Sequence, residues 1–131
     1  MPLLQKNKIF FCLETIPKQY NEKYLYNFKD VVNIIKKINS KWIAINYDTS
    51  IFHYKKMDLI QFNQNLKLIK NIQISQKKFN FFVKPSKVNI KFCNIIKKNY
   101  KIKDISFEII SKKTNLSKLN LFIININKLL N

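Results

Sequence analysis

The chain has 131 residues, which is enough for one domain with one modest hydrophobic core. It carries 25 basic and 7 acidic residues, and its net charge of +18 favours a polyanionic partner. Hydrophobic residues make up 47% of the chain, which excludes a disordered basic tail. The apolar runs are too short for membrane insertion, because a spanning helix needs about 20 apolar residues.

The first half of the chain contains two strand patterns and two helix patterns. The predicted elements are a strand over residues 8–13, a helix over 22–38, a strand over 42–47 and a helix over 56–70. Apolar residues form one stripe along the first helix, at Leu25, Phe28, Val32, Ile35 and Ile38. The second helix repeats this spacing, while residues 42–45 are a nearly continuous apolar run of the kind found in buried strands.

The second half predicts two strands, a short helix and a final strand. Residues 72–83 are rich in Ile and Phe, Pro85 interrupts them, and isoleucines alternate with lysines over 93–105. A helix over 111–119 and a strand over 121–126 complete the series. From residue 42 onward the order matches an α+β, ferredoxin-like split βαβ plan with a long β-hairpin. We therefore expect an N-terminal strand–helix extension over 1–40 and a ferredoxin-like domain over 41–131.

The composition also points to the origin of the chain. Every basic residue is Lys, Gly is absent, and Ala44 is the single alanine, whereas residues with AT-rich codons dominate. The first 17 residues resemble neither a signal peptide nor an Arg-rich transit peptide. We expect a protein encoded and used inside a mitochondrion; a nuclear gene in an AT-rich genome is the alternative.

The residues that could support catalysis or metal binding form no known pattern. Cys12 and Cys93 are far apart, and with one histidine the chain lacks the four ligands of a structural zinc site. His53 has no partner pattern of a catalytic triad, and the seven carboxylates are scattered without paired spacing. The sequence therefore predicts no enzyme, no cofactor, no metal and no small-molecule substrate.

Three segments resemble one protein family. Residues 79–88, Phe-Asn-Phe-Phe-Val-Lys-Pro-Ser-Lys-Val, resemble the Phe-Thr-Val-Leu-x-Ser-Pro-His-Val segment of the S-ten family of small-subunit ribosomal proteins. Residues 97–105 resemble the Arg-Thr-His-Lys-Arg-Leu-x-Asp-Ile strand of that family, and residues 119–126 resemble its final strand. The resemblance implies that residues 72–83 and 93–105 form a hairpin whose tip, residues 84–91, enters rRNA in the head of the small subunit beside neighbouring head proteins.

The predicted RNA-binding residues lie on this hairpin. Lysine contacts phosphates as a flexible point charge, which suits positioning on the RNA backbone and not base readout. Tyr100 is a candidate for stacking on an unpaired base, although packing in a core is the alternative for any aromatic residue. The full predicted set is Lys84, Lys87, Lys91, Lys97, Lys98, Lys101, Lys103 and Tyr100.

The leading hypothesis is therefore a structural constituent of the small subunit of a mitochondrial ribosome, located in the matrix. A soluble accessory subunit of a mitochondrial membrane complex is the alternative, but such a subunit has little need for a charge of +18. A small nucleic-acid-processing enzyme is a third hypothesis, and the scattered carboxylates argue against it.

Overall fold

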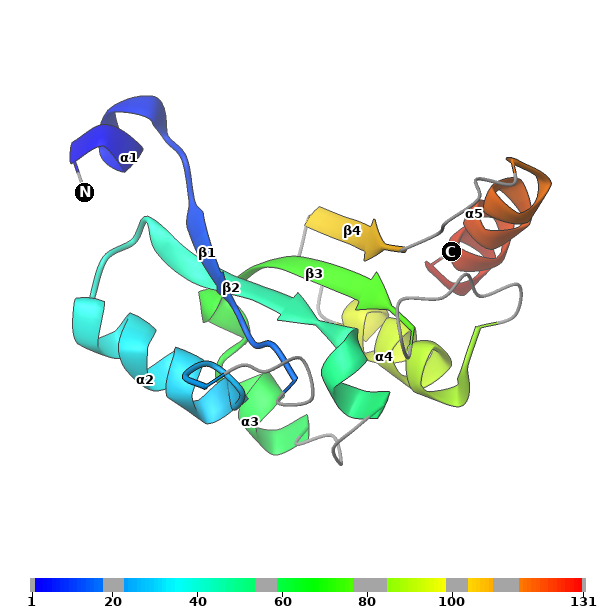
Figure 1. Ribbon diagram of the computed structural model, residues 1–131, viewed down its shortest axis with the longest axis horizontal. Helices are drawn as coiled ribbons and strands as arrows, with labels where there is room; N and C mark the ends of the chain where they lie inside the picture. Colours follow the sequence, from blue (N-terminus) through cyan, green and yellow to red (C-terminus); the bar gives the residue numbers. More distant parts are fainter. Residues whose placement is uncertain are drawn as a thin grey trace.

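A computed structural model describes residues 2–17, 23–53, 59–76, 85–98, 104–109 and 116–130. Strands and helices alternate along these residues (Figure 1). The strands are β1 (Phe11–Glu14), β2 (Ile43–Asp48), β3 (Ile69–Ser75) and β4 (Asp104–Glu108). The helices are α1 (Pro2–Asn7), α2 (Phe28–Ile38), α3 (Leu59–Gln64), α4 (Lys87–Lys98) and α5 (Leu116–Leu130), with 3-10 turns at Thr49–His53 and Leu66–Leu68.

The four strands form one sheet in the order β1-β2-β3-β4, and every neighbouring pair is parallel. Consecutive strands are therefore neighbours, each reached through a helical connection. The pairing of β2 with β3 contains one irregularity, between Ile45 and Asn46. Four consecutive βα units with this order form half of the eight-unit plan of a TIM barrel.

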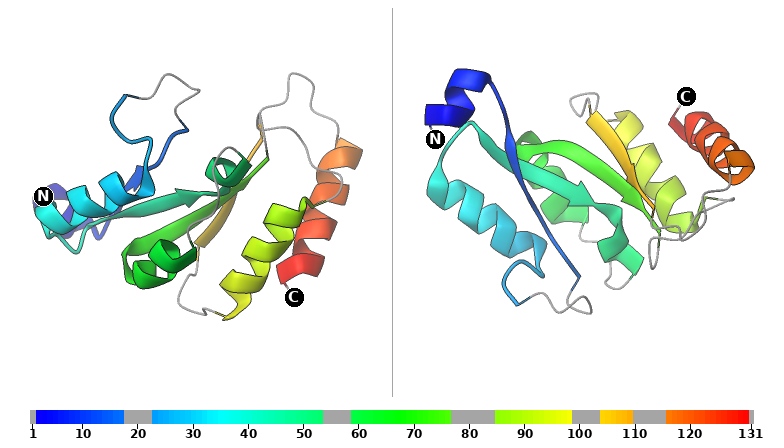
Figure 2. Two further views of the ribbon diagram at one scale, coloured as in Figure 1. Left: turned by 90° about the horizontal axis from the view of Figure 1, so that it is seen from below. Right: turned by 45° about the horizontal axis from the view of Figure 1, so that its top comes forward.

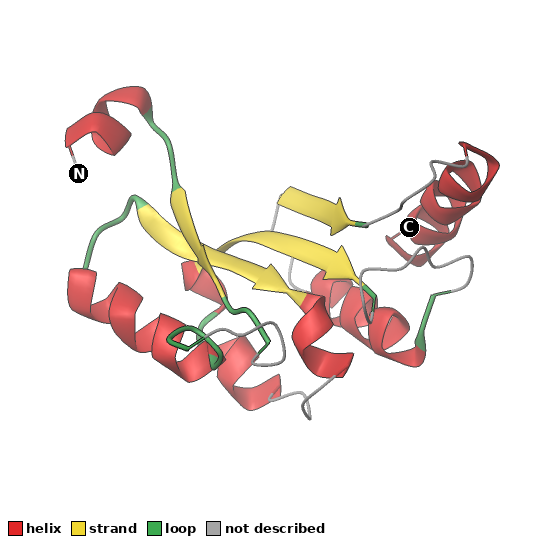
Figure 3. Ribbon diagram, viewed as in Figure 1, coloured by secondary structure: helices red, strands yellow, loops and turns green. Residues whose placement is uncertain are grey.

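Helices α2, α3 and α4 cover one face of the sheet (Figures 2 and 3). The main hydrophobic core lies between these helices and the sheet, and it contains four aromatic rings. Tyr47 of β2 stacks on Phe92 of α4 at 5.6 Å between centroids, and Phe62 of α3 lies 4.6 Å from Tyr47. Phe28 of α2 packs edge-on against Tyr47, with 5.0 Å between the ring centroids. These contacts tie all three helices to the same strand.

Local interactions stabilise the C-terminal end of α2 and the N-terminal end of α4. Asn39 ends α2 in the left-handed conformation, with φ 49°, and its N–H donates to the carbonyl of Ile35. Asparagine is the usual substitute for glycine at this position. At the start of α4, Ser86 Oγ accepts a hydrogen bond from the N–H of Asn89 at 3.1 Å, which satisfies one of the free donors of the first turn.

The predicted ferredoxin-like fold is wrong. Its hairpin requires antiparallel strands, but β3 and β4 are parallel and α4 lies between them in the chain. Residues 93–98, predicted as part of a strand, belong to α4, and residues 121–126, predicted as the final strand, belong to α5. In α4 the buried side chains are Asn89, Phe92, Cys93 and Ile96, the i, i+3, i+4, i+7 spacing of a helix. Residues 99–103 of the predicted strand lie outside the described residues, and its last two residues, 104 and 105, begin β4.

Other predicted elements agree with the structure in position. The strand expected over 42–47 is β2, and the helix expected over 22–38 contains α2. The helix expected over 56–70 contains α3, which ends at Gln64, and a 3-10 turn over Leu66–Leu68 leads into β3 at Ile69. No helix within the described residues is long and apolar enough to cross a membrane.

Candidate functional site

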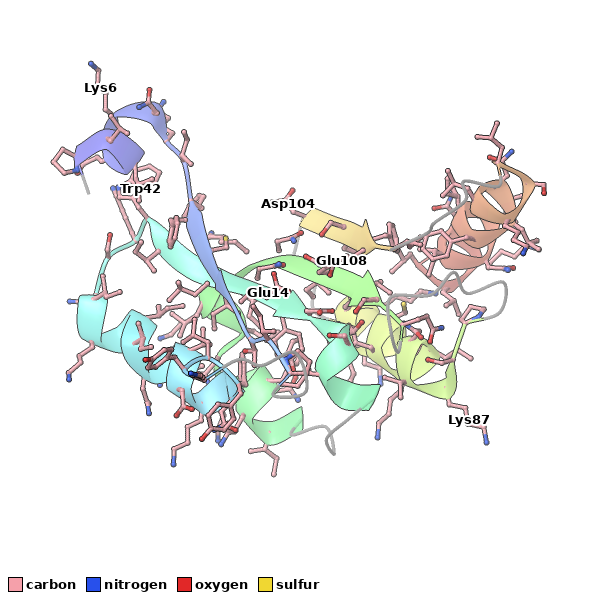
Figure 4. All side chains as sticks on the ribbon, in the orientation of Figure 1. Lys6, Glu14, Trp42, Lys87, Asp104 and Glu108 are labelled. Carbon is pink, nitrogen blue, oxygen red and sulfur yellow. The ribbon has the colours of Figure 1, made fainter. Side chains whose placement is uncertain are left out.

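Each of the four strands ends on a polar residue. Glu14, Asp48, Ser75 and Glu108 are the last residues of β1, β2, β3 and β4. Because the strands are parallel, their carboxyl ends meet at one edge of the sheet, where βα proteins place their sites. Oxygens of Glu14, Asp48 and Glu108 all lie within 4.8 Å of one another. Figure 4 shows Glu14 and Glu108 approaching each other above the sheet.

These side chains lie on the face of the sheet opposite the helices. Residues alternate between the two faces of a strand, so Tyr47 points into the core while Asn46 and Asp48 point the other way. Asp104 and Ser106 share this face with Glu108, at two-residue spacing along β4. We call this surface the carboxylate face.

Amide side chains connect the carboxylates across the sheet. Asn46 Nδ2 donates to Glu14 Oε2 at 2.7 Å and to Gln73 Oε1 at 2.8 Å. Gln73 Nε2 in turn donates to Glu108 Oε2 at 2.6 Å. Asn71 Nδ2 donates to Asn46 Oδ1 at 2.7 Å and to Ser106 Oγ at 2.8 Å. The carboxylate face is therefore one hydrogen-bonded network that spans all four strands.

Asp48 is the most rigidly held member. Its side chain is buried, and the backbone N–H of Ser50 donates to Oδ1 at 2.8 Å. The hydroxyls of Ser50 and Ser75 also donate to this carboxylate. Thr49 fixes the end of β3, since its hydroxyl oxygen accepts the N–H of Ser75 at 2.9 Å. Donors from two strand ends thus fix the orientation of the Asp48 carboxylate.

Glu14 has unusual proton affinity. Burial raises the pKa of its carboxyl from 4.5 to about 7; the hydrogen bond from Asn46 opposes the shift, and the nearby charges of Asp48 and Glu108 add to it. Near neutral pH the carboxyl is therefore present in both its protonated and its ionised form. A group in this condition can both accept and return a proton during a reaction.

The carboxylate face has the opposite charge to the rest of the chain. Only seven residues of the chain are acidic, and four of them lie here: Glu14, Asp48, Asp104 and Glu108. Three carboxylates with no nitrogen or sulfur ligand among them match the donors preferred by hard divalent cations such as Mg²⁺, Mn²⁺ or Ca²⁺. Asp48 and Glu108 would hold such an ion, and the Glu14 carboxylate lies within 4.8 Å of both.

The residues predicted to bind RNA are not part of this arrangement. Lys87, Lys91, Lys97 and Lys98 lie on α4, which covers the other face of the sheet. Lys84, Tyr100, Lys101 and Lys103 lie outside the described residues.

The sequence did not reveal the carboxylate cluster, because its three members are far apart along the chain. A different signal was available: Glu14 and Asp48 each end a short, largely apolar run, and Glu108 ends a run in which polar and apolar residues alternate. In a parallel sheet such residues converge although 34 and 60 positions separate them, which only the correct topology reveals.

Comparison with known proteins places the chain in a family of barrels. The model of a family described as "Xylose isomerase-like TIM barrel" matches residues 1–98. The structure of an L-ribulose 3-epimerase superposes with a TM-score of 0.81 over 96% of this chain at 14% sequence identity, covering 48% of that protein. The 3-keto-D-glucoside 4-epimerase of E. coli gives a TM-score of 0.76 over 96% of this chain at 11% identity, covering 49% of that protein. No curated protein sequence matches the chain.

The chain thus spans about half the length of these two epimerases. The findings overturn the resemblance to the S-ten ribosomal family, and with it the expected role in a mitochondrial ribosome and the expected rRNA and head-protein partners. The alternative, an accessory subunit of a membrane complex, has no support either. The family match also contradicts the prediction of a non-enzyme without a small-molecule substrate.

Proposed function

Because this chain belongs to the xylose isomerase-like TIM barrel family, we propose that its carboxylate face forms half of the active site of a sugar isomerase or epimerase. One observation carries the proposal: Glu14, Asp48 and Glu108, from the ends of three strands, converge within 4.8 Å in a chain that has only seven acidic residues. Carboxylates and amides are also the side chains that bind the hydroxyl groups of a sugar.

The proposed chemistry is proton transfer at a carbon next to a carbonyl group. A base removes the proton, an enediolate forms, and the proton returns to the neighbouring carbon or to the opposite side of the same carbon. Glu14 is the candidate for this base, since its pKa of about 7 allows it to take the proton and to give it back. Asn46 positions Glu14 through the 2.7 Å hydrogen bond. A divalent cation held by Asp48 and Glu108 would polarise the carbonyl oxygen and leave Glu14 free to exchange the proton.

The test is exchange of substrate hydrogen with solvent. We expect the purified chain to incorporate deuterium from D₂O next to the carbonyl of keto-sugars such as ribulose, measured by NMR. Glu14→Gln should slow this exchange by about 10²–10⁴-fold, the usual contribution of a general base. Asp30→Asn, which removes a carboxylate from α2 on the other side of the sheet, is the matched control and should leave the rate unchanged. Failure of a folded wild-type chain to exchange any keto-sugar, or equal rates in the two variants, would contradict the proposal.

A further inference from the structure

A cavity lies at the end of the sheet where β2 and β3 begin and α2 ends. Its volume is about 610 Å³, which falls within the range of about 300–1,000 Å³ for sites that bind small molecules. Because the strands are parallel, Asp48 and Ser75 end β2 and β3 at the opposite end of the sheet. This cavity is therefore separate from the cluster of carboxylates. We call it the lysine pocket, after the residues that line it.

Positive charge dominates the lining of the lysine pocket. Its four lysines are Lys36, Lys41, Lys67 and Lys70. None of the acidic residues that the structure describes is among the lining residues. Lys36 lies in the last turn of α2, where it also interacts favourably with the helix dipole, so the other three lysines are the stronger evidence for a ligand. A concave surface of one charge concentrates the electrostatic field and attracts ions of the opposite charge.

An irregularity of the sheet brings Lys70 to this pocket. Ile45 of β2 pairs with Ile69 of β3, but the next residue, Asn46, pairs with Asn71. Lys70 is therefore an extra residue without a partner on β2, and it is exposed although Ile69 beside it is buried. Strands of parallel sheets are mostly apolar, and bulges are rare in them. Bulges redirect side chains beside functional sites, which is the role that Lys70 fits.

Aromatic rings position two of the ammonium groups. Lys41 Nζ lies 5.2 Å from the ring centroid of Trp42, and Lys70 Nζ lies 4.7 Å from that of Phe10. The two rings also contact each other, with 5.4 Å between their centroids. A ring attracts an ammonium group without neutralising its charge, so both lysines keep their affinity for an anion. Positioning them before a ligand arrives lowers the entropic cost of binding.

We propose that the lysine pocket binds a small molecule that carries a diphosphate group. Lysine binds phosphate as a point charge, and a diphosphate spreads its negative charge over two groups that lysines from several elements can share. Inorganic diphosphate and a nucleoside diphosphate have this chemistry in common. Ile43 and Leu68, which also line the pocket, would add apolar contacts to the nucleoside. The inference rests on the pocket, and not on the proposed activity at the carboxylate face.

Calorimetric titration of the intact chain with inorganic diphosphate and with ADP, at about 0.15 M NaCl, tests the proposal. We expect saturable binding of one ligand per chain. Lys41→Gln combined with Lys70→Gln should raise the dissociation constant at least about 10-fold, because charged hydrogen bonds to phosphate are lost. Lys87→Gln combined with Lys91→Gln removes the same charge from exposed positions of α4 and is the matched control. It should raise the dissociation constant less than about twofold, since charges outside the pocket are screened at this salt.

The two double variants separate a site from general attraction between anions and a chain of charge +18. Equal losses in both, or no saturable binding of either ligand by the wild-type chain, would overturn the proposal. Backbone amide NMR of the wild-type chain gives a second measurement that needs no variant to fold. Either ligand should shift the signals of residues 39–44 and 67–70 and leave those of α4 in place, and shifts confined to α4 would contradict the assignment. The sugar exchange assay bears on neither result.

Discussion

Glu14 combines a position at the end of a strand with a carboxyl group of raised pKa. It ends an edge strand, so its backbone is near solvent, yet its carboxyl is partly buried beside two other carboxylates. Each of these neighbours makes its ionised form less favourable, and only Asn46 stabilises that form by a hydrogen bond. An acid with a raised pKa binds its proton more tightly when the chain is folded, and this makes stability depend on pH.

The direction of this dependence follows from the two pKa values. Between pH 4.5 and about 7 the folded state holds a proton on Glu14 that the unfolded state has lost. The free energy of unfolding should therefore fall as the pH rises through this window, by at most about 1.4 kcal/mol per pH unit and less because solvent screens a partly buried group. Urea denaturation at intervals across the window measures the slope.

Glu14→Gln provides the comparison, since it keeps the shape of the side chain and cannot titrate. Its unfolding free energy should lose this part of the pH dependence, whereas Asp30→Asn should retain it. Identical slopes in wild type and Glu14→Gln would show that the proton is not bound where the environment of Glu14 places it.

At the scale of elements, the sequence was informative where pattern and composition agree. Residues 42–47 combine apolar and β-branched side chains in a short run, and β2 is found there. In residues 93–98 and 121–126 composition and pattern conflict. Isoleucine is abundant throughout this chain, so its preference for strands carries little information, and the helical spacing of Asn89, Phe92 and Ile96 decides the structure.

The candidate site could not be derived from those elements. A carboxylate at the end of a strand becomes part of a site only if the strands are parallel, and that depends on whether a helix or a turn connects them. Assigning α4 to a strand turned a βαβ unit into a hairpin. With a hairpin in place of this unit, the carboxyl ends of the strands no longer lie together, and the cluster of Glu14, Asp48 and Glu108 cannot be predicted.

The end of α2 allows a direct test of a local feature. Asn39 holds the left-handed conformation that glycine adopts freely and that alanine adopts at a cost of about 1–2 kcal/mol. Asn39→Ala should lower the free energy of unfolding by about 1 kcal/mol, and Asn39→Gly should leave it equal or slightly higher. Thermal and urea denaturation measure both. Equal losses in the two variants would mean that the Asn39 side chain, and not its backbone conformation, supports the turn.

At the scale of the whole molecule, acidic and basic residues lie mostly on opposite sides of the sheet. Four of the seven acidic residues lie on the carboxylate face, whereas the lysines of α2 and α4 lie on the helical layer. The net charge of +18 bears on solubility and association, and it carries no information about the fold. The mitochondrial origin and the domain boundary at residue 40, both proposed from the sequence, stay predictions.

The amide network has a consequence for how the sheet assembles. Strands joined by helices have no hairpin turn to set their alignment, so a strand can shift by one residue and point its side chains to the wrong face. Asn71 of β3 donates to Asn46 of β2, Asn46 donates to Gln73 of β3, and Gln73 donates to Glu108 of β4. Asn46 uses both amide hydrogens and its oxygen, so no amide in this series can flip without breaking the next bond. With the bond from Asn46 to Glu14, these hydrogen bonds form together only when all four strands are in the correct register, so the groups proposed for catalysis also stabilise the correct alignment of the sheet.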